Sequence, residues 1–322
     1  MHTIESLQEI FKSNLENYKF PEKPATLYKP VEYILSLGGK RLRPVMVMAA
    51  YNLYREDVEY AFEAGMSIEV FHNFSLLHDD IMDEADMRRG HATVHTLYDE
   101  NTAILSGDVM LIYAYKFLEK YPDKLVGLTS LFTKTSIEVC EGQRMDMDFE
   151  VEDDVTISDY LKMIELKTSV AIAASLSMGA LLAGASEQDQ KHLYEFGKNT
   201  GIAFQIQDDL LDTFGTEALL GKTIGGDIQN RKKTYLYLKS LDLLSSTESD
   251  ELRDIFMDLT GSDYKVERVK ELFEIAHVDI HAEELKMVYQ QLALSHLEAV
   301  SIDAEKKAIL REFSNQLLNR KL

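Results

Sequence analysis

The chain has 322 residues, 45% of them hydrophobic, and a formal net charge of -21. This length and apolar content are enough to bury a large core, and the negative charge argues against a nucleic acid as partner. Cys140 is the only cysteine, so no disulfide can form within the chain, and we expect a cytoplasmic protein. Glu5, Glu9 and Lys12 interrupt the N-terminal segment, which is therefore not predicted to be a signal peptide.

A glycine-rich basic turn is the first feature that points to chemistry. It follows an amphipathic segment over residues 4–15 and a proline-containing link, and it has the sequence Gly38-Gly-Lys-Arg-Leu-Arg-Pro44. The glycines free the backbone, and Pro44 favours the start of a helix, whose N-terminus attracts anions. Lys40 and Arg43 are therefore candidates to bind a diphosphate, and the alternative is a surface turn with solvated charges.

An acidic motif, Asp79-Asp-Ile-Met-Asp83, follows a largely apolar stretch. If the segment is helical, Asp79 and Asp83 lie one turn apart on one face, and each such like-charge pair costs a helix roughly 0.2–0.5 kcal/mol. A solvated acidic face is the alternative interpretation of one such motif. The apolar residues before it, which include Phe71 and Phe74, instead predict a buried helix that carries the acids at its end.

The acidic motif occurs a second time, as Asp208-Asp-Leu-Leu-Asp212 after Phe204-Gln-Ile-Gln. Two carboxylate-bearing helices across a shared cavity would make a site of strongly negative potential that only cations relieve. Carboxylate oxygens suit hard cations, and Mg²⁺ in particular shares its ligands with substrate phosphates. The predicted metal ligands are the six aspartates of the two motifs, Asp79, Asp80, Asp83, Asp208, Asp209 and Asp212.

Other basic residues lie close to these motifs in the sequence. Arg88 and Arg89 follow the first motif, Lys222 and Lys232 follow the second, and Lys167 precedes an apolar segment. Each one by itself is compatible with an ion pair to a nearby carboxylate. Together they predict metals on the aspartates, phosphates on the metals, and Arg and Lys on the remaining phosphate oxygens.

The sequence predicts a single all-α domain over residues 1–322. No proline occurs after Pro122, so long helices are permitted, and strand-like alternation is scarce. The longest uncharged run, residues 168–186, is borderline in length for a membrane span. Because it is rich in Ala, Ser and Gly, we expect a helix buried in a bundle and a protein that does not span a membrane.

Taken together, the motifs resemble those of the trans-isoprenyl diphosphate synthases, which include the farnesyl and geranylgeranyl diphosphate synthases. The resemblance covers roughly residues 30 to 240 and also includes Glu141-Gly-Gln143, Lys167-Thr168 and Gly221-Lys222. It implies an isoprenoid-synthase-type helical bundle around a central apolar cavity, and a homodimer. It also implies three Mg²⁺ ions in each active site.

The resemblance assigns roles to individual residues. Asp79 and Asp83 would hold two Mg²⁺ ions on an allylic diphosphate, and Asp208 would hold the third, supported by Asp209 and Asp212. The residues implied to contact the allylic diphosphate are Arg88, Lys167, Lys222 and Lys232. Those implied to bind isopentenyl diphosphate are Lys40, Arg43, His72 and Arg89. Gln205 and the Lys167-Thr168 pair would face the developing allylic cation.

The implied reaction is the Mg²⁺-dependent head-to-tail condensation of isopentenyl diphosphate with dimethylallyl, geranyl or farnesyl diphosphate. Phe74 would limit the product to fifteen or twenty carbons beside the small Ser75, and geranylgeranyl diphosphate is favoured. Tyr113 or Tyr115 on a facing helix would set a shorter limit, and ordinary core packing is the alternative role of Phe74. The alternative functions are a class I terpene cyclase or squalene-type synthase, and a non-catalytic synthase subunit. The tail, residues 319–322, is a candidate cover for the isopentenyl site.

Overall fold

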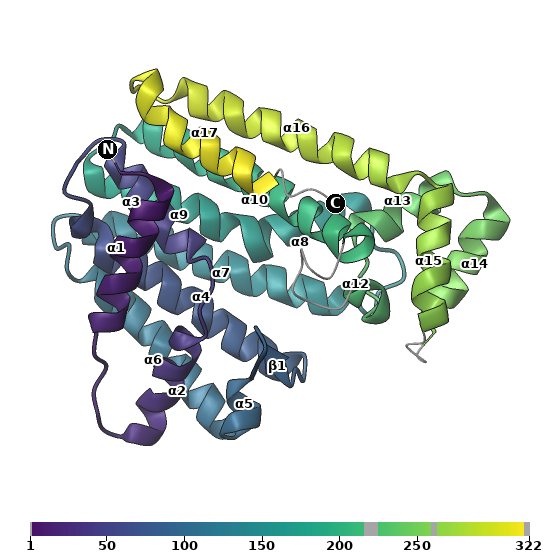
Figure 1. Ribbon diagram of the computed structural model, residues 1–322, viewed down its shortest axis with the longest axis horizontal. Helices are drawn as coiled ribbons and strands as arrows, with labels where there is room; N and C mark the ends of the chain where they lie inside the picture. Colours follow the sequence, from purple (N-terminus) through teal and green to yellow (C-terminus); the bar gives the residue numbers. More distant parts are fainter. Residues whose placement is uncertain (1, 216–224, 259–262, 319–322) are drawn as a thin grey trace. The chain divides into compact units, whose positions relative to one another are not determined.

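The computed structural model describes residues 2–215, 225–258 and 263–318, and it is helical over most of this length (Figure 1). One hairpin of two short antiparallel strands, β1 (Met87–Arg88) and β2 (His91–Ala92), interrupts the helices. The predicted all-α class is therefore confirmed. Lys222 and the tail at residues 319–322 lie outside the described residues.

The chain forms two compact units. The first contains residues 1–133, 174–194 and 301–309, and the second contains residues 134–173, 195–300 and 310–322. Each unit combines segments that are far apart in the sequence, so no single cut of the chain separates them. The prediction of one continuous domain over residues 1–322 stays a prediction.

The first unit is built around the buried helix α4. Its elements are α1 (Ile4–Asn17), α2 (Ala25–Ser36), α3 (Leu42–Asn52), η1 (Val58–Ala61), α4 (Phe62–Met82), α5 (Val94–Leu97), α6 (Glu100–Leu118) and the beginning of α7 (Leu125–Phe149). Residues 64–71 of α4 are all buried, because α3 and α6 pack against it. A Cβ on Gly107 of α6 would lie 2.2 Å from Nε2 of His78, so glycine at this position permits the close approach of α6 to α4.

The second unit has its own apolar core. Its elements are the rest of α7, α8 (Ile157–Ile164), the π-helical turn η2 (Glu165–Ser169), α12 (Gly226–Gln229), α13 (Tyr235–Leu243), α14 (Ser246–Phe256), α15 (Asp263–Ile275) and α16 (Val278–Ala299). Helices α9 (Val170–Ala183), α10 (Glu187–Phe214) and α17 (Ala304–Leu318) contribute residues to both units. Ile202, Ile206 and Leu210 recur at helical spacing along α10 and are buried in this core. Figure 1 shows α14 and α15 as an adjacent pair of helices.

Two glycines flank the π-helical turn η2, which carries Lys167 and Thr168. A Cβ on Gly142 of α7 would lie 2.2 Å from the backbone nitrogen of Lys167, and a Cβ on Gly201 of α10 would lie 2.7 Å from Cα of Ser169. Neither contact can be relieved by rotating a side chain, because both involve backbone atoms. The Glu-Gly-Gln sequence at residues 141–143 is thereby explained as a site where the backbone of η2 meets α7.

One continuous helical stretch, Ile157–Ala183, is long and apolar enough to cross a membrane when only length and composition are considered. In its most apolar window, however, 83% of the residues are buried within the protein. This degree of burial is that of a core helix, as the sequence predicts for residues 168–186.

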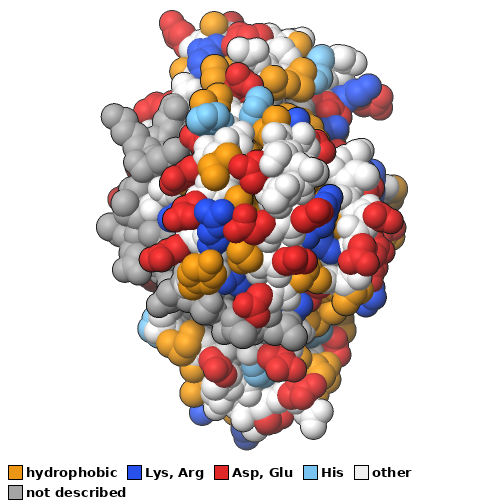
Figure 2. Space-filling view, turned by 90° about the vertical axis from the view of Figure 1, so that its right-hand side faces the viewer, with side chains coloured by type: hydrophobic (Ala, Val, Ile, Leu, Met, Phe, Trp, Pro, Cys, Tyr) orange, Lys and Arg blue, Asp and Glu red, His pale blue; other side chains and the backbone are white. Residues whose placement is uncertain are grey.

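The surface shown in Figure 2 carries acidic, basic and apolar side chains interspersed with one another. Acidic side chains are prominent on this face, in line with the net charge of -21. Such mixing is typical of a protein surface in contact with water.

Candidate active site

The basic turn between α2 and α3 adopts a left-handed backbone at several positions. Gly38 and Gly39 have φ of +79° and +115°, and Arg41 has φ of +48°. Helix α3 begins at Leu42, two residues before Pro44, so the predicted helix start is correct to within a turn. The turn therefore presents its basic side chains at the N-terminal end of a helix.

Arg41 in this turn is held by contacts within the protein. Its guanidinium pairs with the buried Glu69 of α4 and donates to the carbonyl oxygen of Leu35. Asn73 donates to Oε1 of the same Glu69 at 2.7 Å. These contacts fasten the turn to α4 and leave the flanking Lys40 and Arg43 as its ligand-binding candidates.

Arg43 and His72, two residues predicted to bind isopentenyl diphosphate, lie in contact. Nη1 of Arg43 is 3.0 Å from Nε2 of His72. Because a guanidinium only donates hydrogen bonds, Nε2 is the acceptor and the ring proton is on Nδ1. Burial, and then the positive charges of Arg43 and Arg89, hold the pKa of His72 well below its usual value, so the ring is neutral at pH 7.

Arg89 joins this group from the hairpin that follows α4. Its Nη1 donates to the carbonyl oxygen of Gly38, and a Cβ on Gly39 would lie 2.8 Å from that nitrogen. Tyr33 of α2 holds the hairpin by donating to the carbonyl oxygen of Ala92 at 2.6 Å. Gly39 therefore permits Arg89 to lie against the turn, while the exposed Lys40 extends from the same turn.

The first acidic motif lies at the C-terminal end of α4. Asp79 and Asp80 are in the last turn, and Asp83 is the C-cap residue, whose N–H donates to the carbonyl oxygen of Asp79 at 2.8 Å. The predicted helical context is confirmed. Because the C-terminal end of a helix carries partial negative charge, the macrodipole adds to the repulsion among these carboxylates and favours a bound cation.

Asp80 is held by Arg88. The carboxylate is 2% exposed, and Nε of Arg88 donates to its two oxygens at 2.7 and 2.8 Å. Burial raises the pKa of Asp80, and the guanidinium opposes that rise. Nη2 of Arg88 also lies 3.7 Å from Oδ2 of Asp79, so the arginine links the two aspartates.

The second acidic motif is on α10 in the second unit, and its middle carboxylate is buried. Oδ2 of Asp209 accepts from the Tyr160 hydroxyl, and Oδ1 accepts from Nε2 of Gln205 at 3.0 Å. Burial, together with the charge of Asp227, raises the pKa of Asp209 well above its usual value. Oδ2 of Asp212 accepts from the backbone N–H of Asp227 at 2.9 Å.

Lys167 and Lys232, both predicted to bind the allylic diphosphate, meet on one carboxylate that the sequence reasoning missed. Their Nζ atoms lie 2.6 and 3.0 Å from Oδ2 of Asp146 on α7, whose side chain is 11% exposed. Glu150, one turn further along α7, is 3.2 Å from Lys232. The sequence could have indicated Asp146, because it follows Gly142 of the Glu-Gly-Gln motif by four residues and so lies on the same face of the helix. Lys222, the other predicted lysine, lies outside the described residues.

The residues predicted to set chain length fall into two aromatic clusters. Phe74 packs on Phe71 with ring centroids 5.9 Å apart, and Tyr115 packs on Phe132, which in turn contacts Phe71. Tyr113 instead packs on Phe20 and Phe117. Ser75, next to Phe74, donates to the carbonyl oxygen of His72. The structure thus groups Tyr115 with Phe74 and places Tyr113 elsewhere.

The donor chemistry of the two motifs fits Mg²⁺. Both present carboxylate oxygens, and the motif on α4 has them at the negative end of a helix. Among residues 2–215, 225–258 and 263–318, no three Asp, Glu, His or Cys side chains form a ready metal-binding group. The carboxylates that would hold Mg²⁺ are those of the two motifs.

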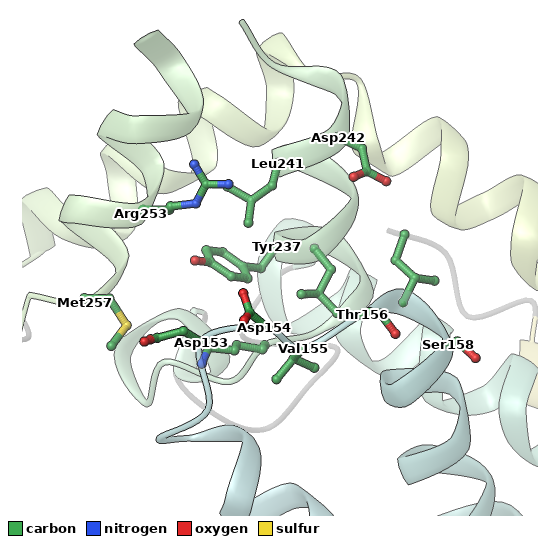
Figure 3. Close-up of a pocket in the computed structure, with 13 residues that line it drawn as sticks. Asp153, Asp154, Val155, Thr156, Ser158, Tyr237, Leu241, Asp242, Arg253 and Met257 are labelled. Atoms are coloured by element: carbon green, nitrogen blue, oxygen red, sulfur yellow. The ribbon is translucent and has the colours of Figure 1, made fainter. Parts of the chain in front are cut away.

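A pocket of about 730 Å³ lies in the second unit (Figure 3). Its lining comes from residues 153–156, the first turn of α8, and residues in and next to α13 and α14. Figure 3 shows Tyr237 between Asp154 and Arg253. None of the residues predicted from the motifs lines this pocket. It is therefore not the candidate active site.

The sequence matches the polyprenyl synthetase family over residues 24–276. A geranylgeranyl pyrophosphate synthase from Geoglobus acetivorans is 38% identical over 321 residues, which cover 98% of each chain. A crystal structure of a geranylgeranyl pyrophosphate synthase is 46% identical, covers all of both chains and superposes with a TM-score of 0.96. A geranylgeranyl pyrophosphate synthase from Corynebacterium glutamicum, complexed with isoprenyl diphosphate and magnesium, is 26% identical with a TM-score of 0.87, covering 99% of this chain and 98% of its own. The predicted isoprenoid-synthase-type fold is confirmed.

Replacing Asp146 by Asn is expected to lower the free energy of unfolding at pH 7 by about 1.5–3 kcal/mol, because two lysines lose a charged acceptor. Burial alone would raise the pKa of Asp146, but Lys167 and Lys232 outweigh it and hold the pKa below its usual value. The stabilisation is therefore fully present above about pH 4 and is lost as the pH falls through the lowered pKa. Urea unfolding of both proteins between pH 3 and 7 measures the difference.

Asp148→Asn on the same helix is the matched control. Asp148 pairs with Arg144, and their side chains are 34% and 69% exposed, so its loss should change stability by less than about 0.5 kcal/mol. Equal effects of the two substitutions at pH 7 would contradict the role given to Asp146.

Proposed function

Because the chain belongs to the polyprenyl synthetase family, we propose that it makes geranylgeranyl diphosphate by adding isopentenyl diphosphate to allylic diphosphates. The predicted reaction class, prenyl transfer by an isoprenyl diphosphate synthase, is confirmed by this membership. The C20 product, the dimethylallyl, geranyl and farnesyl diphosphate starters, and cytoplasmic location are the proposed details. Both acidic motifs are intact, which argues against the alternative of a non-catalytic subunit.

The observation that carries the proposal is the hairpin after α4, where two consecutive arginines turn to two different groups. Arg88 binds Asp80 of the acidic motif, and Arg89 binds Gly38 of the basic turn. One short segment therefore joins a site for cations to a site for an anion. A synthase that holds a metal-bound diphosphate next to a metal-free diphosphate needs this combination, whereas a cyclase with a single diphosphate substrate does not.

In the proposed reaction, Arg43, Arg89 and Lys40 bind the diphosphate of isopentenyl diphosphate, and the neutral His72 is held by Arg43. Donors of this kind are charge-assisted and suit phosphate oxygens. His72 has its Nε2 occupied by Arg43, which leaves Nδ1–H as its only remaining donor.

Lys167 and Lys232 bind the allylic diphosphate and stabilise the charge that develops on it as the carbon–oxygen bond breaks. Asp146 keeps both ammonium groups together before substrate binds. Asp79, Asp83 and Asp208 hold the metal ions, with Asp80, Asp209 and Asp212 supporting them. Three Mg²⁺ ions, when bound, neutralise the diphosphate and make it a better leaving group.

We propose that a homodimer forms through the exposed apolar face of α6. Ile104, Leu105 and Ile112 on this helix are 40%, 59% and 65% exposed, and Leu97 and Tyr98 extend the apolar surface beside its N-terminal end. Large exposed apolar side chains on one helix are typical of a protein interface. A second set of exposed apolar side chains, Ile280, Met287, Val288 and Leu292 on α16, is a competing surface.

The proposed function is tested by incubating the purified protein and Mg²⁺ with labelled isopentenyl diphosphate and, separately, each of the three allylic starters. Chromatography of the products should show C20 as the longest major species from every starter. Removal of Mg²⁺ with a chelator should abolish incorporation and its return should restore it. A folded protein that incorporates no label with any starter would exclude the synthase.

Phe74→Ala is expected to shift the product beyond C20. Phe74 lies five residues before Asp79 on α4, or roughly 7.5 Å along the helix axis, and its ring is only partly buried. Removing the ring opens space for further isoprene units. Mass spectrometry of the products measures the shift. Phe62→Ala truncates a ring that is also partly buried, at the other end of α4, and should leave the product length unchanged. An unchanged C20 product from Phe74→Ala would exclude this residue as the limit.

Ile112→Glu is expected to convert the dimer to a monomer, because a two-fold interface would bury two like charges close together. Light scattering across a range of protein concentrations measures the mass. Met287→Glu makes the equivalent change on α16 and should leave the dimer intact. The opposite result, with only Met287→Glu monomeric, would move the interface to α16.

A further inference from the structure

Tyr160 is a buried tyrosine whose hydroxyl donates a hydrogen bond to an acidic residue of the second motif. The side chain comes from α8, is 1% exposed, and its hydroxyl donates to Oδ2 of Asp209. Oδ1 of the same carboxylate accepts from Nε2 of Gln205 at 3.0 Å. The other end of the Gln205 amide, Oε1, accepts from the Thr168 hydroxyl at 3.3 Å. Four side chains from three helical segments thus form one hydrogen-bonded chain.

The direction of this chain fixes the orientation of two dipoles. Both oxygens of Asp209 accept hydrogen bonds here, Oδ2 from Tyr160 and Oδ1 from the NH₂ end of Gln205, which leaves the carbonyl end of the amide for Thr168. Since Thr168 donates its only hydroxyl proton to Gln205, its free positions are lone pairs. With the amide reversed, Thr168 would accept from Gln205, and its O–H would be available to point elsewhere.

The orientation matters for the proposed reaction, in which Gln205 and Thr168 face the developing allylic cation. Oxygen lone pairs lower the energy of a nearby positive charge, whereas N–H and O–H hydrogens raise it. Dipoles that are fixed before the reaction stabilise the transition state most, because they need no reorganisation. A residue that prevents reversal of the amide therefore contributes to the rate without touching substrate.

We propose that Tyr160 is a positioning residue, which by binding Asp209 holds the Gln205 amide and the Thr168 hydroxyl with their oxygens available to the allylic cation. This inference rests on the proposed function. The second hydrogen bond on the carboxylate keeps it from rotating, so that Oδ1 stays on Gln205. Tyr160 is buried in the core beside α10, where an apolar ring would fill the space equally well; its hydroxyl is the part that serves this role.

The test is Tyr160→Phe, which keeps the ring in the core and removes only the hydroxyl. We expect kcat to fall by roughly tenfold, the loss of about one hydrogen bond, with the KM values for both substrates unchanged. The fraction of allylic diphosphate lost to hydrolysis should rise, because the cation is less well directed to isopentenyl diphosphate. Circular dichroism and thermal unfolding establish that the variant is folded.

Tyr237→Phe is the matched control, because Tyr237 is 5% exposed in the same core and stacks on Phe256 with ring centroids 4.0 Å apart. It should leave kcat and the hydrolysed fraction at the wild-type values. An equal loss of kcat in the two variants would mean that Tyr160 acts only through packing, and would overturn the inference.

A double-mutant cycle with Gln205→Ala separates positioning from general damage. If Tyr160 acts through Gln205, adding Tyr160→Phe to Gln205→Ala should cost almost no further kcat. Additive losses would overturn the inference. An unchanged kcat in Tyr160→Phe, with an active wild type, overturns the inference alone, whereas an inactive wild type overturns the proposed function and this inference with it.

Discussion

Repulsion among neighbouring carboxylates is the constraint on which the rest of this structure depends. The first acidic motif ends α4, where like charges at helical spacing and the negative end of the macrodipole act in the same direction. The protein offsets this cost locally by burying Asp80 against the guanidinium of Arg88. What remains is a helix end that favours cations, and in the proposed reaction this preference becomes the metal site.

The second unit meets the same constraint with different partners. Asp209 is buried, and two neutral donors hold it in place, the hydroxyl of Tyr160 and the amide of Gln205. Asp146 is nearly buried too, but its partners are the ammonium groups of Lys167 and Lys232. Both kinds of donor lower the pKa of the carboxylate that they bind. Burial and the charge of Asp227 nevertheless raise the pKa of Asp209, whereas Lys167 and Lys232 hold the pKa of Asp146 below its usual value.

Close backbone approach is the other requirement, and glycines satisfy it. Gly142 and Gly201 flank the π-helical turn that carries Lys167 and Thr168, and a side chain at either glycine would meet backbone atoms. A π-helical turn places an extra residue in the helix and so changes the direction of neighbouring side chains. Here Lys167 reaches Asp146 on α7, while the adjacent Thr168 reaches α10.

The sequence by itself determined the helical class, because periodicity is a local property of the chain. It indicated the reaction class through the resemblance of its acidic and basic motifs to those of the trans-isoprenyl diphosphate synthases. It also indicated Arg43 and His72, which belong to recognisable motifs. Only the tertiary structure decided the partners: Asp146 and Lys232 are 86 residues apart, and Tyr160 and Asp209 are 49 apart. Nothing in the local sequence distinguishes a buried tyrosine that packs from one whose hydroxyl binds a carboxylate, because that difference depends on which distant helix the fold brings alongside.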